Sequence, residues 1–76
     1  MPHIVVKMYK GRTEEQKQEL TKAISDALIN TISCSEDHVS IAIEEYDKEK
    51  WGAEVFYPDI MTHVSNLYKK PNYKPE

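Results

Sequence analysis

The sequence predicts an α+β fold built as a β-α-β unit, in which two parallel strands are joined by one long helix. Residues 3–8 contain the β-branched run Ile4-Val5-Val6, and Val39, Ile41 and Ile43 alternate with other residues along 39–45. A helical pattern of about 20 residues lies between these segments. A strand, a helix and a strand in this order form a right-handed crossover, which makes the strands parallel and lays the helix on one sheet face. We therefore expect a single domain over residues 1–76, with a short C-terminal helix and a tail at about residues 72–76 that is loose unless Tyr73 docks on a partner.

The helix between the strands has a clear start and a clear apolar face. Thr13 is the expected N-cap, two glutamates follow in the first turn, and Gln16 completes a capping box. The helix is expected to end near residues 33–35. The residues of its apolar stripe recur at three- and four-residue steps, and they are Leu20, Ala23, Ile24, Ala27, Leu28, Thr31 and Ile32.

The C-terminal third is harder to read from its pattern. Residues 53–57 are apolar and fit either a short strand or a helical turn. Pro58 is expected in the first turn of the terminal helix, and Pro71 is expected to end it.

The two strands are expected to leave one sheet face uncovered. Ser40, Ala42 and Val5 share that face and are too small or too apolar to be stable in water. With 76 residues, a single core is only marginally stabilising, and oligomerisation is a common remedy. The fold is therefore expected to be completed by oligomerisation, most simply as a homodimer, with a hexamer or another oligomer left open.

The composition excludes several classes of function. The net charge is −3 and the basic residues are scattered apart from Lys69-Lys70, so no nucleic-acid partner is expected. Cys34 is the one cysteine, no apolar run has the length of a signal peptide, and none approaches a membrane span. These features favour the cytoplasm and no membrane partner. The three histidines lack metal-ligand spacing, so no metal site is expected.

The start of the chain carries a potential base. If Met1 is removed after translation, the ring nitrogen of Pro2 becomes a secondary amine at the start of the first strand. While Met1 is attached, the same nitrogen is a tertiary amide with neither a proton to give nor a usable lone pair. A catalytic reading of Pro2 therefore depends on that one processing event.

Several features together resemble the 4-oxalocrotonate tautomerase family. They cover about residues 2–52, and they are Met1-Pro2, Gly11-Arg12 after the first strand, residues 13–17 at the helix start, the pattern Val-x-Ile-x-Ile at 39–43, and Trp51. The longer C-terminal segment, with Leu67, residues 69–71 and Tyr73, is similar to the dimeric PptA-type tautomerases rather than to shorter hexameric members.

The resemblance implies a cofactor-free keto-enol tautomerisation of 2-oxo acids. Pro2 would be the general base, Arg12 would bind the substrate carboxylate, and Trp51 would form an apolar wall. Members that handle dicarboxylates carry a second arginine where this chain has Ser40, and Arg12 is the only arginine here. The expected substrate is therefore an arylpyruvate-type monocarboxylate, with Ser40 lining the site.

The strand length makes a further prediction about the source of each residue. At roughly 3.3 Å per residue, more than about 20 Å separates Pro2 from Arg12 within one chain. Arg12 should then reach Pro2 of a neighbouring subunit, whereas Ser40 should lie near Pro2 of its own chain.

Less specific interpretations stay open beside this one. Arg12 may be a solvated residue at a helix start, Trp51 an ordinary core aromatic, and Ser40 a small residue on a packed sheet face. His3 has either a surface or pairing role or an effect on the adjacent amine. A dehalogenase, hydratase or decarboxylase of the same superfamily is one alternative activity, and a non-catalytic βαβ dimer or binding module is another.

Overall fold

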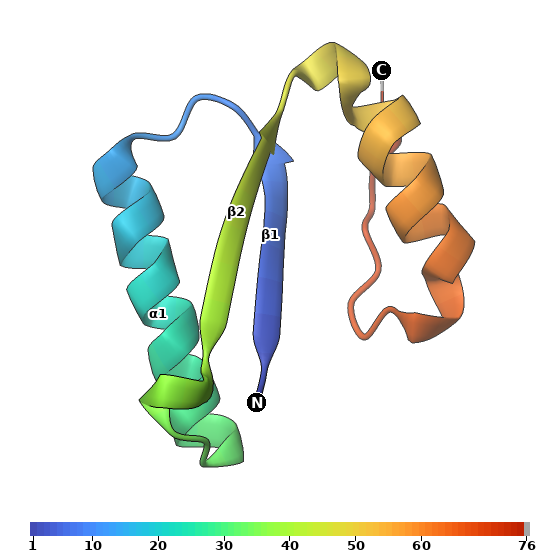
Figure 1. The fold of residues 1–76 in the computed structure, drawn as a ribbon. Helices are drawn as coiled ribbons and strands as arrows, with labels where there is room; N and C mark the ends of the chain where they lie inside the picture. Colours follow the sequence, from blue (N-terminus) through green and yellow to red (C-terminus); the bar gives the residue numbers. More distant parts are fainter. Residues whose placement is uncertain (76) are drawn as a thin grey trace.

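The computed structural model describes residues 1–75, and it contains a two-stranded parallel sheet with one long helix beside it (Figure 1). The elements, in chain order, are β1 (His3–Tyr9), α1 (Glu14–Ile32), η1 (Glu36–His38), β2 (Ser40–Tyr46), η2 (Lys48–Lys50), η3 (Gly52–Ile60) and η4 (Met61–Asn66). The predicted α+β class and the β-α-β order are confirmed.

The register of the sheet fixes which residues share an end. His3 lies opposite Ser40 at the amino end of the strands, and Tyr9 lies opposite Tyr46 at the carboxyl end. One backbone bond continues the ladder beyond each end: Ser40 N–H donates to the Pro2 carbonyl at 3.2 Å, and Lys10 N–H donates to the Tyr46 carbonyl at 3.0 Å. The parallel arrangement therefore holds Pro2 and Ser40 together, as the sequence predicted.

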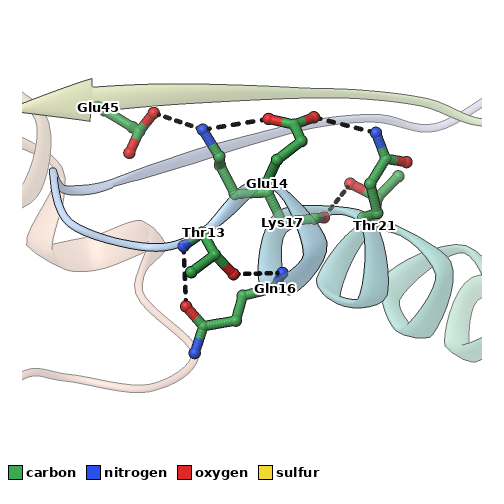
Figure 2. Close-up of polar contacts among 7 residues, drawn as sticks. Thr13, Glu14, Gln16, Lys17, Thr21 and Glu45 are labelled. Atoms are coloured by element: carbon green, nitrogen blue, oxygen red, sulfur yellow. Dashed lines mark hydrogen bonds and ion pairs between the residues drawn. The ribbon is translucent and has the colours of Figure 1, made fainter.

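The start of α1 follows the predicted capping box (Figure 2). The Thr13 hydroxyl accepts from Gln16 N–H at 3.0 Å, and the Gln16 side-chain oxygen accepts from Thr13 N–H at 2.9 Å. The helix ends at Ser33, which adopts a left-handed conformation (φ 57°) and donates its N–H to the Ile29 carbonyl. Both ends of this helix are thus specified locally, by side chains and backbone groups within four residues.

The apolar stripe of α1 is only partly covered by the sheet. Ile24 and Leu28 are half-buried, whereas Leu20 and Ile32 are exposed, and no residue of α1 is fully buried. Within a single chain, the predicted apolar stripe is therefore only partly buried. A two-stranded sheet is too narrow to cover the full width of the stripe, so part of it stays available to another surface.

The C-terminal helix begins earlier than predicted. Helical turns run from Gly52 to Asn66, wide in η3 and tight in η4, with a kink at His63, whose backbone is non-helical (φ −121°, ψ 31°). Pro58 lies inside η3. The placement of Pro58 in the first turn is therefore wrong, and the ambiguous residues 53–57 are helical. A proline ring clashes with the carbonyl four residues earlier in an α-helix, and the wider π-type turn relieves that clash.

The buried core of the described chain lies at the carboxyl end of the strands. Trp51, Val55 and Phe56 are the buried apolar side chains, and Tyr9, Tyr46 and Ile60 pack against them. On the sheet itself, Val5 is 42% exposed. This small, one-sided core supports the expectation that oligomerisation completes the fold.

Among residues 1–75, no helix is both long and apolar enough to cross a membrane.

Candidate active site

Pro2 stands directly before β1, and the sheet fixes its position. It is half-buried, and its carbonyl accepts the Ser40 N–H bond that extends the ladder. Met1 is exposed, so nothing in the described chain covers the residue that must leave before the Pro2 nitrogen becomes an amine. The amino end of the sheet thus holds a potential base in a defined place.

His3 and Ser40 form a side-chain pair beside Pro2. His3 Nδ1 and Ser40 Oγ share a hydrogen bond of 2.7 Å across the sheet. Both side chains are exposed, and both residues begin their strands. The pairing role predicted for His3 is confirmed. Its partner was missed, because the second strand was expected to start at residue 39 and the register of the two strands was not predicted.

Arg12 lies in the turn between β1 and α1, at the opposite end of the sheet from Pro2. Gly11 before it has φ +123°, a conformation that favours glycine, and no atom within 4 Å would meet a side chain there. The Arg12 side chain is exposed and makes no hydrogen bond or ion pair with residues 1–75. Its guanidinium is therefore available to a ligand or to another chain.

The neighbouring charges at this end are already paired. Lys7 binds Asp59, which raises the pKa of the lysine, and Lys10 binds Asp47 at 3.0 Å, which lowers the pKa of that carboxyl. The Tyr46 hydroxyl donates to Glu44 at 2.9 Å, and this bond raises the pKa of the tyrosine. Arg12 thus differs from Lys7 and Lys10, because it has no hydrogen-bond or ion-pair partner among residues 1–75.

Trp51 lies in the core at the carboxyl end of the strands. Its ring meets Tyr9 edge-on at 5.1 Å between centroids and Tyr46 at 6.0 Å. Its indole N–H donates to the Tyr73 hydroxyl at 2.9 Å, and 8% of the residue remains exposed. Within one chain, Trp51 therefore packs as a core aromatic, which is one of the two roles that the sequence left open.

One chain brings together only part of the predicted constellation. Pro2, Ser40 and the additional residue His3 meet at the amino end, whereas Arg12 and Trp51 lie at the carboxyl end (Figure 1). The seven residues of β1 correspond to about 20 Å of extended chain between the two groups. A site that uses all four predicted residues must therefore draw on two chains.

With this geometry in place, comparison with known proteins identifies the class. Residues 2–58 match the family described as tautomerase enzyme, which covers most of the chain. The chain belongs to the tautomerase family, and it is accordingly an enzyme of the isomerase class.

Individual relatives narrow the relationship further. The chain is 36% identical over 73 residues to a probable tautomerase of Xylella fastidiosa, covering 96% of this chain and 89% of the relative. It is 35% identical over 74 residues to tautomerase PptA of Pectobacterium carotovorum, covering 96% and 97%. The crystal structure of YwhB, a homologue of 4-oxalocrotonate tautomerase, aligns with a TM-score of 0.61 at 40% identity over 62% of this chain and 77% of that one. The match to PptA thus includes the C-terminal segment, and the predicted likeness to the 4-oxalocrotonate tautomerase family and to PptA is confirmed.

Proposed function

We propose that this enzyme is a cofactor-free tautomerase that interconverts the enol and keto forms of 2-oxo acids, with Pro2 as general base once Met1 has been removed. The observation that carries the proposal is the position of Pro2 in a chain of this family. Its carbonyl is bound by Ser40 N–H, and the ring is half-buried at the sheet end. A base must be held at one place to act on one proton, and the sheet provides that restraint.

The proposed reaction needs only proton transfer. The neutral Pro2 amine takes the proton from the enol hydroxyl, and the electron pair of that O–H bond forms the new C=O bond. The electrons of the C=C bond then take the proton back from the Pro2 ammonium at C3. Both a nearby cation and an apolar surrounding disfavour the charged amine, which keeps part of it in the basic form near neutral pH.

Arg12 of a neighbouring subunit is proposed to bind the substrate carboxylate through a bidentate pair of hydrogen bonds. Its exposure and its lack of a partner among residues 1–75 support this role. Trp51 of the same neighbouring subunit, which is 8% exposed within one chain, is proposed to form the apolar wall. The assembly is proposed to be a homodimer.

Replacement of Pro2 by Ala tests the proposed base. We expect turnover of phenylpyruvate enol to fall by about 10²- to 10⁴-fold, the usual contribution of a general base, with the oligomer size unchanged. Intact mass must show that both proteins lack Met1, and a chain that retains Met1 should be as inactive as the variant. Turnover within twofold of the parent would instead favour a non-catalytic role for the terminus.

The substrate class rests on Ser40 and on the single arginine. A monocarboxylate with an aromatic tail should react faster than a dicarboxylate enol, because one arginine can hold only one carboxylate bidentately. Ser40→Arg should raise kcat/KM for the dicarboxylate relative to the aryl monocarboxylate, and Ser40→Gln provides an uncharged control of similar length. Equal changes in both variants would exclude a role for charge at this position.

A further inference from the structure

The C-terminal residues fold back onto the core of their own chain. After η4, residues 71–75 return toward the start of η3 (Figure 1). The Tyr73 ring packs against Phe56 at 5.3 Å between centroids, and Pro75 lies so close to Gly52 that a side chain there would meet its ring at 3.4 Å. Residues 71–75, which we call the C-terminal strap, thus contact η3 at two places.

The strap also satisfies the polar group of Trp51. An indole N–H can only donate, and a buried indole usually finds an acceptor. The Tyr73 hydroxyl is that acceptor, at 2.9 Å. Tyr9 and Tyr46 meet the same indole edge-on from the strands. Three tyrosines from separate parts of the chain therefore hold one tryptophan.

The orientation of Trp51 decides which of its atoms a ligand can meet. Because 8% of the residue is exposed, only a small surface is open to a ligand, and a rotation of the ring would change which atoms form that surface. Tyr9 and Tyr46 restrain the ring by packing alone, whereas Tyr73 restrains it through a directional hydrogen bond.

We propose that Tyr73 is a positioning residue, which holds the Trp51 indole in the orientation that contacts the aryl group of the substrate. This inference rests on the proposed function, because it takes Trp51 as the apolar wall of the site. It assigns the C-terminal strap to substrate recognition in addition to packing, although Tyr73 itself lies away from the reacting atoms.

Tyr73→Phe isolates the hydrogen bond from the packing. The variant keeps the ring against Phe56 and removes only the hydroxyl, and 46% of Tyr73 is exposed, so little buried volume changes. Tyr68→Phe is the matched control, since it removes a hydroxyl from a fully exposed tyrosine between η4 and the C-terminal strap. Unfolding midpoints in urea should show that both variants remain folded.

Tryptophan fluorescence reports the orientation directly, because Trp51 is the only tryptophan. We expect Tyr73→Phe to shift the emission to longer wavelength and to increase quenching by acrylamide, and Tyr68→Phe to change neither. An unchanged spectrum in Tyr73→Phe would overturn the proposal, because the hydroxyl would then not hold the ring.

Affinity for cinnamate, an aryl carboxylate that cannot tautomerise, separates this inference from the proposed reaction. Calorimetry should show weaker binding to Tyr73→Phe, by up to about five-fold, because one ordinary neutral hydrogen bond limits how strongly the hydroxyl can favour the bound orientation of the indole. KM for phenylpyruvate enol should rise equally, with kcat unchanged. A changed spectrum with unchanged affinity would overturn the inference, because Trp51 would then not contact the aryl group. Cinnamate binding does not need proton transfer, so failure of Pro2 as base would leave this result readable.

Discussion

The two ends of the sheet differ in almost every physical respect. The amino end carries Pro2, His3 and Ser40, which are exposed or half-buried and are held by hydrogen bonds across the strands. The carboxyl end carries the buried aromatic cluster around Trp51 and, beside it, the unpaired cation Arg12. Under the proposed function, the amino end would supply the base and the carboxyl end would supply the groups that bind the substrate. Each chain would then contribute half of a site.

The largest expected difference between the two ends is in stability. Trp51→Ala should lower the free energy of unfolding by about 3–5 kcal/mol, because it removes a large side chain from a core with few other buried members. Ser40→Ala at the amino end should cost about 1 kcal/mol or less, the loss of one exposed hydrogen bond. Urea unfolding at a fixed protein concentration measures both. Similar losses would mean that the two ends are packed alike in the assembled protein.

The next effect is on substrate binding at the carboxyl end. Arg12→Ala should reduce kcat/KM for phenylpyruvate enol by about 100-fold, because a bidentate, charge-assisted pair of hydrogen bonds is lost. Lys10→Ala is the control, since it removes a cation two residues away that is already bound to Asp47. Steady-state kinetics should show little change in the control. An equal loss in both variants would indicate a general effect of positive charge rather than a specific contact.

The smallest effect concerns the tie between α1 and the carboxyl end of β2. Lys17 donates to Glu45 at 2.9 Å (Figure 2), and this bond raises the pKa of Lys17 above its usual value of 10.5. A raised folded-state pKa stabilises the protein fully below about pH 10.5, and this contribution is lost as the pH rises through the folded value. The free energy of unfolding should therefore fall above pH 10.5, and Glu45→Gln should reduce that fall.

Lys22 and Asp26 provide the matched control for this pair. They form a similar bond at 2.8 Å, but their side chains are 79% and 54% exposed, against 21% and 26% for Lys17 and Glu45. Because solvent screens the more exposed pair more strongly, Asp26→Asn should alter the fall in the free energy of unfolding less than Glu45→Gln does. Thermal unfolding from pH 9 to 12 would test this order, and a larger effect of Asp26→Asn would contradict it.

The parts of the fold that the sequence predicted well are those set by local or periodic signals. The capping box joins Thr13 to Gln16, three residues later. The order strand, helix, strand is enough to give a parallel pair with Pro2 beside Ser40. The start of the C-terminal helix was predicted incorrectly from Pro58. The preference of proline for the first turn applies to α-helices, whereas η3 has wider turns and contains Pro58 in its interior.

The parts that were not predicted depend on contacts between distant residues. Tyr73 bonds to Trp51 across 22 residues, and no local pattern distinguishes a tyrosine that returns to the core from one on a loose tail. For the same reason, the position of Trp51 in the core of its own chain could not be separated in advance from a position in a binding site. The association of Arg12 with Pro2 depends on a second chain, so it remains a prediction.

Mixing two inactive variants tests the central claim, that Pro2 and Arg12 of one site come from different chains. Pro2→Ala and Arg12→Ala proteins, purified separately, would be mixed in equal amounts and allowed to exchange subunits, and turnover of phenylpyruvate enol would be measured. In a two-fold symmetric dimer, half of the molecules become hybrids and each hybrid has one intact site, so about a quarter of the parent activity should return. If exchange is demonstrated by mass and activity does not return, Pro2 and Arg12 do not act together across the subunit interface.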